Sequence, residues 1–153
     1  IGIERGDATG GIACIDSVEC SPMYEDIAGE PEGYTVLTDQ LPSELSNGGG
    51  YRNELGIRFK PKAYGKITHA RLYTSAQEGG VHFVSVWDYA TKQLVSNEIY
   101  EWNILPGYEG WREFRLPEAV PVEAGKMYVL SVTAGPDCMF VLDKSMNTVI
   151  ENE

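Results

Sequence analysis

The sequence predicts an all-β protein, an antiparallel β-sandwich of the jelly-roll-like kind with about eight strands. From Glu54 onward, short apolar runs with a period of two residues are separated by turn signals about every 8 to 15 residues, a pattern typical of sandwiches and barrels. Glycine and proline fall between these runs. No run of about ten residues has helical periodicity. The 153 residues fit the usual length of one domain.

The first 53 residues are expected to form a loop-rich segment that docks on the sandwich within a single domain of residues 1–153. This segment is rich in Gly, Ser, Asp and Glu and contains three prolines. Residues 34–38 have the β-branched and aromatic content of an edge strand. The run Asn47-Gly48-Gly49-Gly50 marks a flexible turn before the regular part of the chain begins.

Alternation of side chains predicts which faces of the later strands are buried. In residues 55–60 the apolar side chains alternate with small or charged ones, so the apolar face belongs to the core. The same alternation in residues 126–134 places a second apolar set on one face. The predicted core residues are Leu55, Ile57, Phe59, Tyr128, Leu130 and Val132. The predicted strands are residues 55–60, 66–74, 82–88, 93–100, 111–116, 126–134, 138–142 and 148–150.

The three cysteines cannot all pair within one chain. The spacing of Cys14 and Cys20 matches neither the CxxC pattern of zinc sites nor that of redox sites. These two either remain thiols or close a short disulfide loop in an oxidising compartment. Cys138 lies in an apolar stretch and is expected to be a buried thiol.

An acidic composition narrows the range of partners. The chain has 12 basic and 23 acidic residues, a formal net charge of −11 and a pI of about 4.6, so nucleic acid and anionic membranes are unfavourable partners. No apolar run approaches the roughly 18 residues of a membrane span. We expect an extracellular or cell-surface protein that requires no cofactor. Acidic loops suit a structural calcium ion, with Asp39, Glu54 and Asp137 as candidate ligands.

The residues give little support for an enzyme. His69 and His82 lie in predicted strands, and neither accompanies a serine or cysteine in a nucleophile motif. His82 is expected to be a packed, hydrogen-bonded structural residue. A hydrolase with paired carboxylates is a weaker alternative, because 23 acidic residues bring some pair close together on any compact surface. We therefore predict a protein without catalytic residues.

A series of short motifs in consistent order resembles a bacterial family of secreted domains of unknown function. The motifs, spanning about Glu54 to Val141, are Gly65-Lys66-Ile67-Thr68, Ala70-Arg71-Leu72-Tyr73, Gly80-Val81-His82, Val86-Trp87, Gly110-Trp111 and Ala124-Gly125-Lys126-Met127-Tyr128-Val129-Leu130-Ser131. The resemblance implies a β-sandwich like a carbohydrate-binding module, attached to other modules of a larger protein. It also implies that Trp87 and Trp111 belong to the core. The acidic first segment and the stretch from Tyr100 to Gly110 depart from the family pattern.

Aromatic residues in predicted loops indicate a non-catalytic site for a polysaccharide or glycan. A sugar ring offers C–H groups on one face and hydroxyls at its rim, so an exposed aromatic ring with polar neighbours suits it. Trp102 and Tyr108 are predicted to lie on one loop with Asn103 and Glu109. The alternative is that Trp102 caps the end of the sandwich and packs against Leu105.

Three further residues complete the candidate ligand site. Tyr89 lies in a predicted turn, and Tyr51 and Arg52 follow the glycine run. The rival function is that of a structural, protein-interaction or adhesion module, in which the aromatic residues face inward. Burial of Trp102 and Tyr108 would favour that rival.

Overall fold

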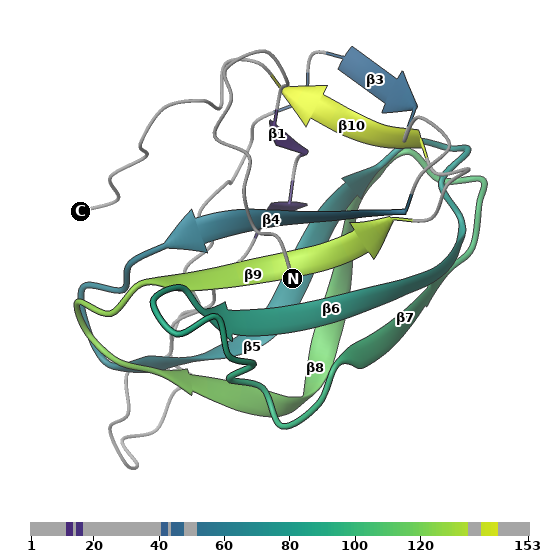
Figure 1. Ribbon diagram of the computed structural model, residues 1–153. Coiled ribbons are helices and arrows are strands. Elements are labelled where there is room, and N and C mark those ends of the chain that lie inside the picture. Colours follow the sequence, from purple (N-terminus) through teal and green to yellow (C-terminus); the bar gives the residue numbers. More distant parts are fainter. Residues whose placement is uncertain are drawn as a thin grey trace, which may run out of the picture.

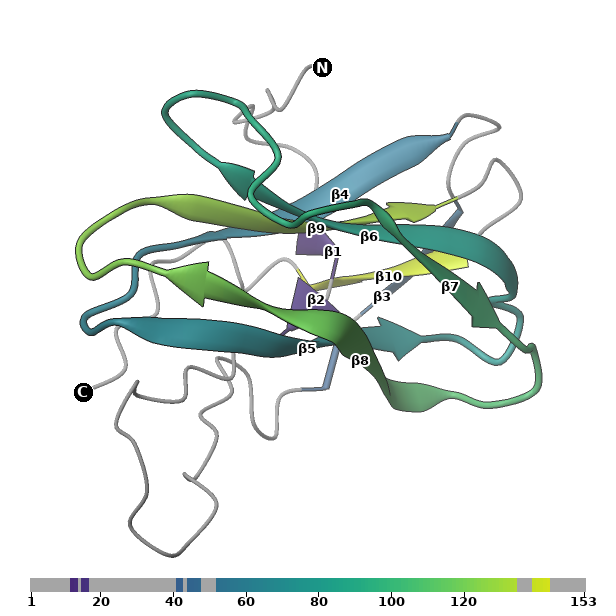
Figure 2. The same cartoon turned by 90° about the horizontal axis from the view of Figure 1, so that it is seen from below.

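The computed structural model describes residues 12–13, 15–16, 41–42, 44–47, 52–134 and 139–143. These residues form strands, turns and bends, with no helix among them. The strands make two antiparallel sheets that lie one over the other (Figures 1 and 2). The predicted all-β, antiparallel fold is therefore confirmed. Within the same ranges, no helix is long and apolar enough to cross a membrane.

The first sheet has four strands in the order β4-β9-β6-β7. They are β4 (Asn53–Phe59), β6 (Gly80–Asp88), β7 (Tyr100–Ile104) and β9 (Tyr128–Ala134). β9 pairs with β4 along its whole length and with β6 on its other side. β4 and β7 are consequently the two edges of this sheet.

The second sheet has the path β1-β10-β5-β2, to which β3 adds beside β10 and β8 beside β5. Its strands are β1 (Ile12–Ala13), β2 (Ile15–Asp16), β3 (Glu44–Asn47), β5 (Gly65–Thr74), β8 (Gly110–Val122) and β10 (Met139–Asp143). The β5–β8 pair is the longest ladder of this sheet. Parts of the first 53 residues therefore contribute short strands to it.

The apolar core draws side chains from both sheets. Tyr128, Leu130 and Val132 are buried as predicted. Leu55 and its two alternating partners on β4 are only half-buried and pack against the margin of the core, because β4 is an edge strand with a neighbour on one side. The buried cluster consists of Ile67, Ala70, Leu72, Val84, Val86, Tyr100, Ile104, Leu116, Val120, Val122, Tyr128, Leu130 and Val132.

The predicted strand at residues 93–100 is wrong. Only Leu94 makes an isolated bridge, to Trp87, and the strand β7 begins at Tyr100. Within β7, buried Tyr100 and Ile104 alternate with exposed residues, so the period of two belongs to residues 100–104. Asp88 caps a turn at residues 89–91, since its Oδ1 accepts hydrogen bonds from two following backbone N–H groups, and the chain then bends at residues 96–98 before β7.

Strand β8 continues beyond the predicted end at Leu116 to Val122. It passes through two prolines, which lack the N–H that a central strand requires. Pro117 falls in an irregularity of the β5–β8 register, and Pro121 lies opposite Lys66. Among the described strands, β8 pairs with β5 alone, and an edge strand tolerates proline.

Several predictions concern residues outside the described ranges. These are the strands at residues 34–38 and 148–150, the thiols of Cys14, Cys20 and Cys138, the ligand candidate Tyr51, and the calcium candidates Asp39 and Asp137. They remain predictions.

Candidate functional site

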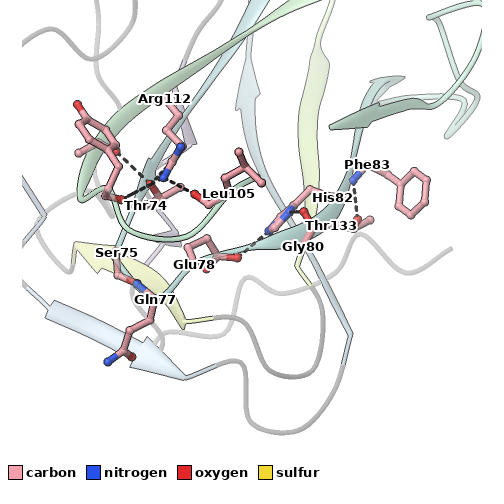
Figure 3. Close-up of polar contacts among 12 residues, drawn as sticks. Thr74, Ser75, Gln77, Glu78, Gly80, His82, Phe83, Leu105, Arg112 and Thr133 are labelled. Atoms are coloured by element: carbon pink, nitrogen blue, oxygen red, sulfur yellow. Dashed lines mark hydrogen bonds and ion pairs between the residues drawn. The ribbon is translucent and has the colours of Figure 1, made fainter. Parts of the chain in front are cut away.

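Arg112 holds the loop between β7 and β8 in place. Its Nε donates to Thr74 Oγ1 at 2.8 Å, and one Nη donates to the carbonyl oxygens of Leu105 at 2.7 Å and Tyr108 at 3.3 Å. Figure 3 shows the Arg112 side chain reaching both Thr74 and Leu105. Because a guanidinium is a planar fork of donors, one side chain ties the loop to β5.

The ring of Tyr108 is exposed but held from two sides. Its exposed fraction is 52%, while the Arg112 Cζ lies 5.0 Å from the ring centroid, within the range of a cation–π contact. Gly110 lies against the same ring, since a Cβ there would be 2.7 Å from the Tyr108 Oη. Tyr108 is therefore a solvent-facing aromatic ring on a loop of restricted shape.

The expectation that Trp102 shares this loop is wrong. Trp102 belongs to β7, where it is half-buried and opposite His82. Its ring stacks on Phe114, with centroids 5.4 Å apart and an interplanar angle of 28°. Phe114 therefore takes the place of Leu105, which is 70% exposed. The structure separates Trp102 from the exposed platform at Tyr108.

The two polar candidates near Tyr108, Asn103 and Glu109, are both exposed. Asn103 lies on β7 and is exposed, and Glu109 follows Tyr108 in the loop and is also exposed. Asn103 is opposite Val81 of β6, in the half of the sheet from which the loop emerges. Both side chains are available to solvent at the same end of the fold as Tyr108.

The loop between β5 and β6 supports the Tyr108 loop. The N–H of Gly107 donates to the carbonyl of Ala76 at 2.7 Å. At the base of this second loop, His82 Nε2 lies 2.6 Å from Glu78 Oε1 and His82 Nδ1 lies 3.1 Å from the carbonyl oxygen of Gly80 (Figure 3). His82 and Glu78 are both buried. His82 is thus a packed, hydrogen-bonded residue, as predicted.

Tyr89 lies at the opposite end of the first sheet, directly after β6 ends at Asp88. Arg58 Nη1 donates to the Tyr89 Oη at 3.1 Å, and the Arg58 Cζ lies 5.2 Å from the ring centroid. The Lys92 Nζ lies 3.9 Å from the same centroid. The structure therefore places Tyr89 among cations and away from Tyr108.

Asp88 and Lys126 form an ion pair beside this cluster. The Lys126 Nζ lies 3.0 Å from Asp88 Oδ2. The backbone N–H of Thr91 donates to Asp88 and, together with Lys126 and the N–H of Ala90, lowers the pKa of this carboxyl to about 2. The hydrogen bond to Asp88 raises the pKa of Lys126. Asp88 is therefore a carboxylate that organises the turn containing Tyr89.

Arg52 and Trp111 also have defined surroundings. The Arg52 Cζ lies 5.6 Å from the centroid of Phe83 on β6. Trp111 is half-buried, and its ring meets Tyr73 edge to face at 5.6 Å with Arg71 over it. The core position implied for Trp111 is thus only partly met. Trp87 is buried, as implied.

The calcium candidate Glu54 is engaged by two donors. Its Oε1 accepts hydrogen bonds from Trp87 Nε1 at 3.1 Å and Ser131 Oγ at 2.7 Å. In the part of the chain that the structure describes, no three His, Cys, Asp or Glu residues gather in a way that could hold a metal ion. Glu54 therefore anchors the buried indole of Trp87 across the β4–β9 pair.

Residues 39–148 match the family described as Domain of unknown function (DUF4082). The chain belongs to the DUF4082 family. No curated protein and no solved structure matches the chain. The matched range of the DUF4082 domain includes the stretch whose motifs resembled a family of unknown function, together with both ends of the first sheet.

Sequence reasoning missed three residues that shape these ends of the DUF4082 domain: Arg112, Arg58 and Lys92. A partial signal exists for Arg112, which follows Tyr108 by four residues with a glycine between them. For Arg58 the alternation in residues 55–60 predicts only a solvent-facing position. Its contact with Tyr89 joins residues 31 positions apart, and no local pattern reports such a distance.

Proposed function

We propose that this domain is a non-catalytic carbohydrate-binding module for a polysaccharide or glycan. The observation that carries the proposal is the exposed ring of Tyr108, held by Arg112 and Gly110. An aromatic side chain that is fixed before binding loses little conformational entropy when a ligand arrives. Such a ring offers the C–H face of a sugar a prepared apolar surface.

Polar groups beside the platform supply the hydrogen-bonding part of the proposed site. Asn103 provides both a donor and an acceptor, and Glu109 provides acceptors. Both side chains are exposed, so both can reach the hydroxyls of a sugar that stacks on Tyr108. Trp102 has a supporting role in this proposal, because its ring already stacks on Phe114.

The architecture and setting belong to the same proposal. We infer a jelly-roll-like β-sandwich, which is supported by the shared core of the two sheets and by the eight described strands longer than two residues. The domain would act outside a bacterial cell or at its surface, beside other modules of its parent protein, where multivalency raises a modest affinity. No cofactor is required, and a calcium ion would be structural.

Binding to an immobilised panel of neutral polysaccharides tests the proposal. Tyr108→Ala should weaken binding about fivefold, because loss of one aromatic stacking contact costs on the order of 1 kcal/mol. Tyr64→Ala is the matched control, since Tyr64 is 60% exposed and lies at the other end of the sheet. Circular dichroism checks that both variants fold.

Two results would reject the carbohydrate assignment at Tyr108. Equal weakening by Tyr108→Ala and Tyr64→Ala would mean that the contact is not specific to this loop. The absence of any bound polysaccharide would favour the alternative, a structural or protein-interaction module. Exposed Leu105 next to Tyr108 supports that alternative, because it extends an apolar surface suited to a protein partner.

A further inference from the structure

Half of the basic residues of this acidic chain gather at one end of the fold. This is the end where β4 and β6 finish and β5 and β9 begin, at the left in Figure 1. Six of the 12 basic residues lie there, and all six are exposed. They are Arg58, Lys60, Lys62, Lys66, Lys92 and Lys126. The chain as a whole has 23 acidic residues and a formal net charge of −11.

Two carboxylates described at this end contact a single one of its cations. They are Asp88 and Glu123, and both lie against one cation, Lys126, at 3.0 and 3.6 Å. Within the described ranges neither carboxylate pairs with Arg58 or Lys92, so these two cations give this end a local surplus of positive charge. Such a local surplus produces a positive potential even on a protein of opposite net charge.

Arg58 and Lys92 form the centre of the cationic end. Both contact the ring of Tyr89, with their charged groups 5.2 and 3.9 Å from its centroid. No ion pair joins either of them to a carboxylate within the described ranges. Two cations held beside one ring repel each other, so an anionic ligand that bridges them relieves this repulsion.

The turn that carries Lys92 has a defined shape before any ligand binds. The N–H of Lys92 donates to the carbonyl of Asp88 at 2.9 Å, and Lys92 adopts a left-handed backbone with φ of 60°. The carboxylate of Asp88 caps the same turn through Ala90 and Thr91. Tyr89 then receives Arg58 from β4 by a hydrogen bond. The two cations are therefore prepositioned by two separate elements.

We propose that this cationic end binds an anionic polysaccharide, whose carboxylate or sulfate groups pair with Arg58 and Lys92. Tyr89 is a positioning residue that holds both cations. The acidic remainder of the chain opposes a densely charged nucleic acid, whereas a polymer with separated anionic groups meets less repulsion. The inference does not rest on the Tyr108 site, because the two lie at opposite ends of the first sheet.

Affinity measurements at low and high salt test this inference. The probes are polygalacturonate for carboxylates, chondroitin sulfate for sulfates, neutral galactan and double-stranded DNA. Arg58→Gln and Lys92→Asn should each weaken polyanion binding about tenfold at 50 mM salt, because charge-assisted hydrogen bonds are lost. Asparagine suits the positive φ at residue 92. Arg115→Gln is the control, since it removes one positive charge from an exposed position of β8 and should change affinity less than about twofold.

Each outcome decides the inference. Loss of binding in Arg58→Gln and Lys92→Asn with retention in Arg115→Gln supports it, and the preferred probe identifies carboxylate or sulfate as the ligand group. Equal losses of polyanion affinity in all three variants would mean that binding depends only on net charge, and would overturn a defined site at Arg58 and Lys92. Tighter binding of DNA than of either polysaccharide, or no binding of any polyanion, would also overturn it. If no neutral polysaccharide binds at Tyr108, the proposed function fails there, but the measurements at Arg58 and Lys92 keep their meaning.

Discussion

Replacement of Gly110 by alanine tests whether the glycine shapes the exposed platform of Tyr108. Gly110 has a φ of +142°, and a Cβ at this position would lie 2.7 to 3.1 Å from three atoms of the Tyr108 ring. Alanine therefore introduces two perturbations: a strained backbone and a displaced aromatic ring. The variant Gly107→Ala isolates the backbone strain, because Gly107 has a φ of +103° but no atom within 4 Å of the position of an added Cβ.

The expected magnitudes differ between the two glycines. An unfavourable positive φ costs about 1–3 kcal/mol, and the lower entropy of the unfolded chain offsets about 0.4–1 kcal/mol of this. Gly107→Ala should therefore lower the free energy of unfolding by about 1–2 kcal/mol. Gly110→Ala also displaces the ring from Arg112, and loss of the cation–π contact adds about 0.5–1 kcal/mol.

Urea denaturation of both variants, with the m-value compared with that of the parent chain, measures these differences. Binding to the neutral polysaccharide panel provides the second measurement. We expect Gly107→Ala to retain most of the affinity and Gly110→Ala to lose it with the shifted ring. Equal stability and equal binding of the two alanine variants would refute the argument that the Tyr108 ring rests on Gly110.

Three further substitutions test contacts outside this loop. Glu78→Ala leaves the buried His82 without its carboxylate and should lower the free energy of unfolding by about 3 kcal/mol, measured by urea denaturation. Trp87→Phe removes the indole N–H that donates to Glu54 and, at 2.9 Å, to Ser131 Oγ, and should cost about 1–2 kcal/mol by the same assay. The Asp88 carboxyl has a pKa of about 2 in the folded chain against an ordinary 3.8. Its contribution to stability is therefore complete above about pH 4 and is lost as the pH falls towards 2, so Asp88→Asn should flatten this part of the stability profile.

Matched controls separate these effects from general damage. Gln77→Ala changes an exposed residue next to Glu78 and should have little effect on unfolding. A cost for Glu78→Ala as small as that of Gln77→Ala would contradict the importance of the buried pair. For Trp87, an unchanged free energy of unfolding would show that its indole N–H bonds contribute nothing. An acid profile of Asp88→Asn identical to that of the parent chain would contradict the assigned pKa of Asp88.

The strand positions were predictable where the period of two coincided with a ladder that pairs on both sides. Residues 126–134 are an example, because β9 lies between β4 and β6 and the predicted apolar face of Tyr128, Leu130 and Val132 is buried, although Val129 and Ser131 on the other face are buried as well. Prediction failed at residues 93–100 because Leu94 and its neighbours have the composition of a strand, while the chain pairs with β6 only over residues 93–95 and then bends at residues 96–98. The prediction also ended this strand too early, before Pro117. The sequence alone does not show that β8 is an edge strand, where proline is tolerated.

By itself the sequence determined an antiparallel all-β fold, an acidic composition and several aromatic residues in predicted loops. Alternation of apolar and polar side chains and the count of charged residues can both be read from the chain locally. It also identified Tyr108 as a candidate for ligand binding. Only the tertiary structure decided that Trp102 stacks on Phe114 and that two cations, Arg58 and Lys92, contact the ring of Tyr89. The first contact joins two strands of different sheets and the Arg58–Tyr89 contact joins residues 31 positions apart, so their geometry depends on sheet packing and register, which no single segment specifies.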